Sequence, residues 1–163
     1  MLVDYNQIIP GRLWVGSFIE ISDSRQLQRM GITVVISLQT DKDLKQCRIP
    51  LAKLVKSLED ANIDLRRIPV EDFNREDLAL QLPKCVSEIE AALAQGWAKV
   101  YLHCTAGVLR SPTVAAAYLI KAHSMPAHEA RDLLIEKRDC NPDLELLEKY
   151  QNALKGAQTG LGL

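Results

Sequence analysis

Aromatic residues are scarce in this chain, where phenylalanine, tyrosine and tryptophan make up 5% of the 163 residues. Sugar polymers are bound on aromatic platforms, so this scarcity disfavours an extended carbohydrate-binding surface. No apolar run approaches the roughly 20 residues that span a bilayer, and no basic and then apolar leader opens the chain. With a net charge of −1, we expect neither nucleic acid nor a membrane as the main partner.

Cysteine is also sparse. The four cysteines are Cys47, Cys85, Cys104 and Cys140, and their spacing matches neither a zinc site nor a disulfide framework. The length, the hydrophobic content of 47% and the charged content of 25% are typical of one globular domain, expected here as a monomer. We expect that domain over residues 1–155, followed by a flexible, glycine-rich C-terminal tail over 156–163.

Hydrophobic periodicity predicts alternating strands and helices. Strands are expected as a hairpin over 8–16 and as single strands over 33–38, 63–70 and 99–103. Helices are expected over 23–30, 51–61, 76–95 (interrupted at Pro83), 113–122, 127–138 and 143–155, with a polar loop up to Ile49. This order predicts an α/β fold, in which a central, mostly parallel, twisted sheet of four to five strands is flanked by helices.

The stretch from Val100 to Thr113 predicts an anion site at the carboxyl end of a strand. It reads as a short apolar strand, a loop from Cys104 to Arg110 and a helix that starts near Ser111. Such a loop can turn its backbone N–H groups inward, with Gly107 supplying a conformation that other residues resist. The partial positive charge of the following helix points at the same place, which suits a phosphate monoester.

The loop also holds a nucleophile. A thiol at a helix N-terminus beside a guanidinium ionises more readily than a free thiol, so we expect Cys104 to be a thiolate at neutral pH. Arg110 can bind two phosphate oxygens with its planar fork, which lysine cannot do. Ser111 can hydrogen-bond the sulfur and stabilise it as a leaving group. His103 is expected to orient the loop through backbone hydrogen bonds and not to serve as acid or base.

The segment His103–Ser111 (HCTAGVLRS) resembles the HCxxGxxR(S/T) signature of the cysteine-dependent phosphatases, in particular the dual-specificity branch. Beyond this loop the chain is similar to plant glucan phosphatases of the starch-excess type and to laforin-like catalytic domains. The matching segments are 5–16, 38–44, Asp72–Phe73, Leu82–Pro83 and 137–142. The resemblance implies the cysteine-phosphatase fold and a cysteinyl-phosphate intermediate, with no cofactor.

The expelled alkoxide or phenoxide needs a proton, and a carboxylic acid on a loop over the site is the natural donor. Asp72 follows a predicted strand, and its position relative to Cys104 matches the acid of the dual-specificity family. Glu71 is the local competitor. The same acid can later take a proton from the water that attacks the intermediate. No metal is required for this chemistry, because the loop and Arg110 neutralise the oxyanion.

The remaining loop residues limit the classes of substrate that the site can bind. Thr105, Ala106, Val108 and Leu109 carry no charge, which disfavours polyanionic lipids and RNA ends. Glucan phosphatases usually carry glycine where this chain has Leu109, and aromatics where it has Gln46–Cys47 and Asn141. Phe73 and Tyr5 remain as candidate substrate contacts, with packing as the alternative role for both.

These observations favour a dual-specificity phosphatase for phosphotyrosine and phosphoserine/threonine proteins. The alternatives are a glucan phosphatase acting on starch- or glycogen-like polymer, a non-catalytic phospho-binding adaptor, and a sulfurtransferase. A catalytic thiolate needs a reducing compartment, so we expect a cytoplasmic protein, or a stromal one in a photosynthetic eukaryote. Cys140 and Cys85 are candidates to trap oxidised Cys104 in a disulfide, against the simpler reading of inert core thiols.

Overall fold

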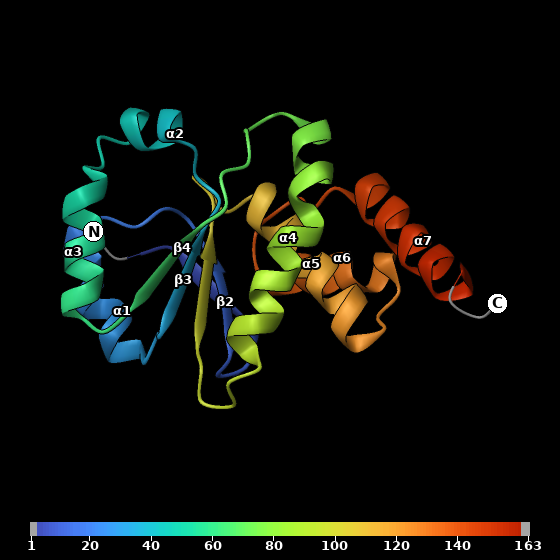
Figure 1. Ribbon diagram of the computed structural model, residues 1–163, viewed down its shortest axis with the longest axis horizontal. Coiled ribbons are helices and arrows are strands. Elements are labelled where there is room, and N and C mark those ends of the chain that lie inside the picture. Colours follow the sequence, from blue (N-terminus) through green and yellow to red (C-terminus); the bar gives the residue numbers. More distant parts are fainter. Residues whose placement is uncertain (1–2, 161–163) are drawn as a thin grey trace.

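The sheet at the centre of the computed structural model, which describes residues 3–160, has five strands in the order β1-β2-β5-β3-β4 (Figure 1). The strands are β1 (Tyr5–Ile9), β2 (Leu13–Gly16), β3 (Val34–Ser37), β4 (Asp64–Arg67) and β5 (Val100–His103). β1 and β2 pair antiparallel, whereas all other neighbours pair in parallel. The predicted α/β fold with a mostly parallel sheet is confirmed.

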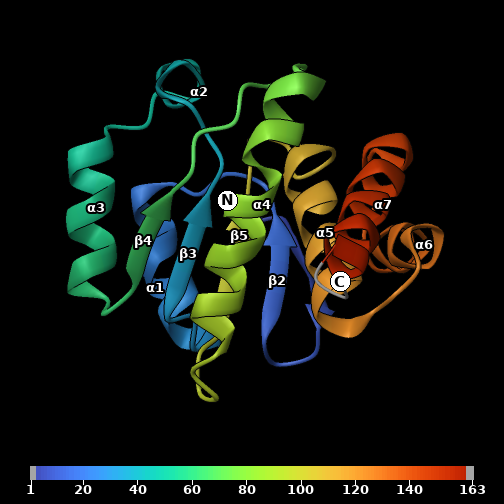
Figure 2. The same cartoon turned by 45° about the vertical axis from the view of Figure 1, so that its right-hand side comes forward.

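Helices cover both faces of the sheet (Figures 1 and 2). One face carries the 3-10 helix η1 (Ile21–Asp23) with α1 (Ser24–Met30) and α3 (Leu51–Asp60). The opposite face carries α4 (Arg75–Leu93), α5 (Arg110–His123), α6 (Ala127–Lys137) and α7 (Leu144–Gly160). The short helix α2 (Asp41–Gln46) lies beyond the carboxyl end of β3 (Figure 2). No helix within residues 3–160 has the length and apolarity needed to cross a membrane.

Alternation along the strands divides the core in two. In β5, Val100 and Leu102 belong to the larger cluster beneath α4–α7, and Tyr101 belongs to the smaller cluster beneath α1 and α3. Successive side chains of a strand point to opposite faces, so a strand buried on both faces must be apolar throughout. β5, the central strand of the sheet, is therefore fixed from both sides, and so is the start of the loop that follows it.

Several details differ from the sequence prediction, among them the start of the hairpin, at Tyr5 and not at residue 8. The polar stretch before Ile49 contains α2, which begins with a capping box between Thr40 and Asp43. Helix α4 continues through Pro83, which lies on the exposed side of a helix whose other side is buried. Strand β4 is confined to Asp64–Arg67 instead of 63–70. Helix α7 runs to Gly160, so the expected boundary at 155 falls inside it, and residues 161–163 of the predicted tail lie outside the described residues.

Candidate active site

The carboxyl ends of four neighbouring strands lie level with one another. His103 at the end of β5 is in register with Gly16 of β2 and with Ser37 of β3, and Ser37 is in register with Arg67 of β4. The loops that leave these strands therefore meet at one edge of the sheet, where open α/β folds bind ligands. One of them is the phosphate loop, defined here as residues 104–110.

Every backbone carbonyl oxygen from Cys104 to Leu109 faces outward from the phosphate loop and accepts a hydrogen bond there. The carbonyls of Cys104, Thr105 and Ala106 accept from His103 Nδ1 (2.8 Å), Phe18 N (2.9 Å) and Arg138 Nη2 (3.2 Å). The carbonyls of Gly107, Val108 and Leu109 accept from Arg138 Nε (2.7 Å), Asn141 N (2.8 Å) and Thr113 Oγ1 (2.7 Å). In a trans peptide the C=O and the next N–H point in opposite directions. Outward carbonyls therefore turn the amide N–H groups toward the centre, which gives the cup that the sequence predicts.

Gly107 makes this shape possible. Its φ of +68° lies in the left-handed region, where a side chain is disfavoured. A Cβ atom at this position would lie 2.6 Å from the carbonyl carbon and oxygen of Gly16. The glycine is therefore required both for backbone conformation and for the close approach of the β2 terminus.

The sulfur of Cys104 lies inside the cup, where the residue is 3% exposed. Its Sγ accepts a hydrogen bond from Gly107 N at 3.3 Å and lies 3.2 Å from Ser111 Oγ. Helix α5 begins at Arg110, so the positive end of its dipole is directed at the same region. The Gly107 amide, the Ser111 hydroxyl and a helix N-terminus thus converge on one sulfur atom.

Arg110 is 2% exposed and is held along one side of its guanidinium. Nη1 donates to Asp43 Oδ2 at 2.7 Å and to the Val70 carbonyl at 2.8 Å. Nη2 donates to Thr105 Oγ1 at 3.2 Å, whereas Nε has no hydrogen-bond partner among the described residues. Nε and Nη2 form the edge of an arginine that binds an oxyanion through two parallel hydrogen bonds.

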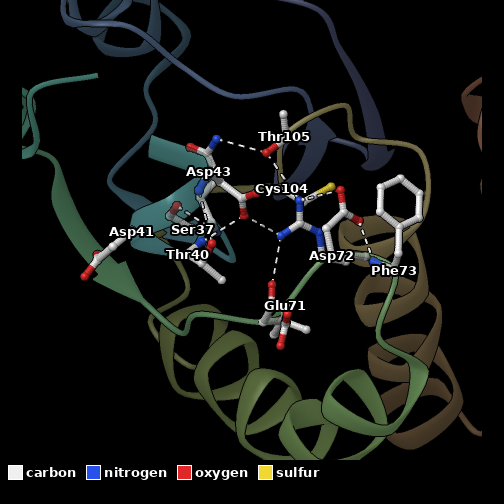
Figure 3. A network of polar contacts seen from close by, with 12 residues as sticks. Ser37, Thr40, Asp41, Asp43, Glu71, Asp72, Phe73, Cys104 and Thr105 are labelled. Atoms are coloured by element: carbon white, nitrogen blue, oxygen red, sulfur yellow. Dashed lines mark hydrogen bonds and ion pairs between the residues drawn. The ribbon is translucent and has the colours of Figure 1, made fainter. Parts of the chain in front are cut away.

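Asp43 was not predicted from the sequence. Figure 3 shows Asp43 of helix α2 and Asp72 of the loop after β4 converging on the same point as Cys104 and Thr105 of the phosphate loop. Burial would raise the pKa of the Asp43 carboxyl, but hydrogen bonds from Arg110 and Thr40 lower it below its usual value. The Thr-x-x-Asp pattern at Thr40 was the available signal for the helix; nothing in the sequence indicated that its carboxylate reaches Arg110.

The two candidate acids lie side by side but face differently. Asp72 Oδ2 is 3.2 Å from Arg110 Nη2, and Asp72 Oδ1 accepts a hydrogen bond from Phe73 N at 3.1 Å. Glu71 is exposed; its carboxylate accepts a hydrogen bond from Asn74 Nδ2 at 3.4 Å and its backbone N–H donates to Asp77 Oδ2 at 2.7 Å, with no contact to Arg110 among the described residues. The structure brings Asp72, and not Glu71, to the edge of the phosphate loop.

His103 has the backbone contact expected of it. Its Nδ1 lies 2.8 Å from the Cys104 carbonyl oxygen, which can only accept, so Nδ1 carries the proton. Burial lowers the pKa of His103 to about 4, and the nearby positive charge of Arg110 contributes to this shift. The ring is therefore neutral at physiological pH.

A cleft of about 620 Å³ opens beside Arg110, between the loop after β4 and the connection from α6 to α7. Phe73 lines it and is 92% exposed, with a left-handed φ of +57°. Tyr5 is not among the residues that line the cleft, and its ring packs edge-on against Tyr101 with a centroid distance of 6.4 Å. Of the two aromatic candidates, only Phe73 lies at the site.

The two cysteines named as candidate partners of Cys104 have the surroundings of core thiols. Burial raises the pKa of Cys85 to about 12 and also raises that of Cys140, whose thiol donates to the Leu134 carbonyl at 3.4 Å. Disulfide exchange requires a thiolate, so these environments favour core thiols over partners for Cys104. All four cysteines are free.

Comparison with known proteins agrees with this geometry. The family model of the dual specificity phosphatase catalytic domain matches residues 13–152. A phosphoglucan phosphatase of Castanea sativa (DSP4, amyloplastic) is 32% identical over 150 residues, which are 90% of this chain and 39% of that protein. The dual specificity protein phosphatase Mpk3 of Drosophila melanogaster is 29% identical over 88% of this chain and 32% of its own length. The chain thus spans less than half of the length of these relatives.

Solved structures share the fold. The crystal structure of PTPMT1 superimposes with a TM-score of 0.76 at 22% identity, covering 96% of this chain and 99% of the other. Human DUSP28 gives a TM-score of 0.72 at 24% identity, covering 93% and 95%. Because the family model spans most of the sequence, including the phosphate loop and Asp72, the chain belongs to the family of dual specificity phosphatase catalytic domains.

Proposed function

We propose that the protein is a phosphomonoester hydrolase that acts through a cysteinyl-phosphate intermediate on phosphotyrosine and phosphoserine/threonine proteins. The observation that carries this proposal is the ring of outward carbonyls from Cys104 to Leu109, which turns the loop amides toward Cys104 Sγ. Amides and one guanidinium directed at a single point stabilise a dianion and a thiolate alike.

In the first step the Cys104 thiolate attacks phosphorus. The S–P bond forms, the P–O bond to the leaving oxygen breaks, and that oxygen takes the proton of the Asp72 carboxyl. A phosphate bound by Arg110 Nε and Nη2 competes with Asp72 for Nη2, which lies 3.2 Å from Asp72 Oδ2. Substrate binding therefore releases the Asp72 carboxyl from the guanidinium of Arg110.

In the second step water attacks the cysteinyl-phosphate and Asp72 takes its proton. The new P–O bond forms, the S–P bond breaks and inorganic phosphate leaves. Ser111 Oγ, 3.2 Å from Cys104 Sγ, donates a hydrogen bond to the departing thiolate. His103, neutral and bonded to the backbone, keeps the start of the loop in place and exchanges no proton.

The cleft beside Arg110 supports a peptide substrate. It combines apolar side chains (Phe73, Leu78, Leu109, Leu144) with arginines that are already bonded to protein groups, since Arg75 pairs with Asp143 and Glu145. Phe73 is the single aromatic side chain among the described residues that line it, whereas a sugar polymer calls for several stacking platforms.

We further propose that residues 1–155 suffice as the catalytic unit.

A glucan phosphatase is the second candidate, favoured by the 32% identity to the phosphoglucan phosphatase of Castanea sativa. Initial rates on an aryl phosphate, phosphotyrosine and phosphoserine peptides, phosphorylated amylopectin and a phosphoinositide discriminate these functions. We expect the highest kcat/KM on the peptides. A strong preference for amylopectin would reverse the order of the two candidates.

Substituting Cys104 with serine tests for catalysis. The variant should lose turnover on every substrate yet still bind phosphopeptide, because the amides and Arg110 remain. Wild-type protein that releases no phosphate from an aryl phosphate in reductant, with vanadate without effect on release, and that still binds phosphopeptide would instead support the phospho-binding adaptor.

A further inference from the structure

Arg138 contacts the phosphate loop through the outward carbonyls of Ala106 and Gly107, and its side chain is 3% exposed. It follows helix α6 in the chain, 28 positions after Arg110. Its Nε donates to the Gly107 carbonyl at 2.7 Å and its Nη2 to the Ala106 carbonyl at 3.2 Å. One guanidinium thus holds two consecutive carbonyls at the glycine that shapes the cup.

The other N–H groups of Arg138 reach the start of the chain. Nη1 donates to Asp4 Oδ1 at 3.2 Å and to Asn6 Oδ1 at 3.1 Å, and Nη2 donates to Asp4 Oδ2 at 2.8 Å. A guanidinium has five N–H donors, and here each has an acceptor. The orientation of the fork is therefore fully determined, by two loop carbonyls on one side and by two side chains around β1 on the other.

These contacts bear directly on anion binding. The Gly107 amide donates to Cys104 Sγ at 3.3 Å, and the Ala106 carbonyl belongs to the same peptide plane as that amide. If the Ala106 carbonyl loses its outside donor, this plane can turn, which removes an N–H from the sulfur and brings a carbonyl oxygen toward it. The same applies to Gly107 and the following amide.

We propose that Arg138 is a positioning residue that holds the phosphate loop in its anion-binding shape, and that Asp4 and Asn6 in turn hold Arg138. This inference rests on the proposed function, because it concerns the same sulfur and the same loop. It adds that residues of and beside strand β1 support the active site, because Asp4 and Asn6 contact Arg138 although they lie more than 130 positions away in the sequence.

The test compares Arg138→Lys with Arg12→Lys. Arg12 is a matched control, because it also donates to three backbone carbonyls (Leu93, Gln95 and Ala98) but near the amino end of β5. We expect Arg138→Lys to lower kcat on an aryl phosphate by about 10- to 100-fold, the range that a small misplacement of reacting groups produces. It should also move the pH midpoint of Cys104 alkylation upward and weaken protection by vanadate, while Arg12→Lys changes thermal stability only.

The Asp4→Ala/Asn6→Ala double variant removes three of the five acceptors of Arg138 and leaves the interior unchanged, so it decides the matter even where Arg138→Lys does not fold. It should shift alkylation in the same direction and reduce kcat by about two- to fivefold, the scale of an exposed ion pair. Wild-type kcat and alkylation profile in the variants, with only a lower melting temperature, would refute the positioning role. Failure of the proposed function is distinguishable, because the wild-type protein itself would then lack turnover and vanadate protection.

Discussion

Asp43 and Arg110 form a buried ion pair across the site: Asp43 Oδ2 lies 2.7 Å from Arg110 Nη1, and their side chains are 9% and 2% exposed. The pair joins the capping box of α2 to the first residue of α5. The ion pair holds Nη1 of the guanidinium in place. It therefore sets the direction in which Arg110 presents its Nε and Nη2 N–H groups.

Replacing Asp43 with alanine should impair both stability and catalysis. The change removes the buried partner of the Arg110 charge and leaves only the partly exposed Asp72 beside it. We therefore expect a loss of about 3 kcal/mol, the lower end of what breaking a buried ion pair costs. The freed guanidinium also loses its orientation, so kcat/KM on an aryl phosphate should fall by about 10- to 100-fold. Urea unfolding and steady-state kinetics measure the two effects.

Asp41→Ala provides the control, because Asp41 stands in the first turn of the same helix and pairs with Arg67 while 89% exposed. An exposed ion pair contributes only about 0–1 kcal/mol, so both measurements should stay close to wild type. Similar losses in the two variants would show that α2, and not the Asp43–Arg110 contact, is what matters.

The identity of the acid can be tested by leaving-group dependence. Asp72→Ala should slow hydrolysis of phenyl phosphate, a poor leaving group, by about 10²- to 10⁴-fold, the usual contribution of general acid catalysis. The loss on p-nitrophenyl phosphate should be much smaller, because that phenoxide leaves without a proton. Glu71→Ala, the adjacent control, should lower both rates little; equal losses on both esters in Asp72→Ala would remove Asp72 from the acid role.

Much of the fold is readable from the sequence because β-branched and apolar runs such as 33–38 and 99–103 leave no alternative to buried strands. Helix α2 was missed, since six residues with one buried leucine carry little periodicity and the helix depends on its cap. Pro83 was misleading, because one exposed proline weighs less than the buried face of Leu78, Leu82 and Ile89 along α4.

Cys104, Gly107, Arg110 and Ser111 form a contiguous motif with fixed spacing, and the structure brings Asp72, from a separate loop, to within 3.2 Å of Arg110. The residues that hold them, Asp43 and Arg138, act over 67 and 31 positions of the chain. Nothing in the local sequence distinguishes a surface charge from one that reaches a loop carbonyl or a buried guanidinium. Whether a charged side chain reaches the site depends on which strand ends lie side by side. That is set by the register of the strands in the folded sheet.

Gly107 should tolerate no side chain. In Gly107→Ala the Cβ would lie 2.6 Å from the Gly16 backbone, in a residue with φ of +68°. The loop must move, so we expect turnover and vanadate protection of Cys104 to be nearly lost. Gly11→Ala is the control, because φ is +71° there but nothing lies within 4 Å of the new Cβ.

The Gly11 variant therefore carries the left-handed strain alone, about 1–2 kcal/mol, and should be less stable but fully active. Melting temperature and kcat, measured for both variants, separate strain from collision. Full activity in Gly107→Ala would mean that the phosphate loop needs neither its close contact with the end of β2 nor that with Arg138 Nη2, which would also lie 2.6 Å from the new Cβ.

His103 should make the stability of the protein depend on pH. Its pKa is about 4 in the folded state against 6.5 unfolded, so on acidification the unfolded chain takes up the proton first. The folded state therefore loses stability as the pH falls from 6.5 to about 4, by about 3 kcal/mol in total, with no further loss from this group below that range. Urea unfolding at a series of pH values gives the slope of the free energy of unfolding against pH.

In His103→Asn, where an amide can still donate to the Cys104 carbonyl, this slope should flatten between pH 6.5 and about 4. Asp23, whose pKa is raised by burial, contributes a slope of opposite sign that is common to both proteins. The difference between the two curves thus isolates His103, and parallel curves would show that this ring is protonated as readily in the folded protein as in the unfolded chain.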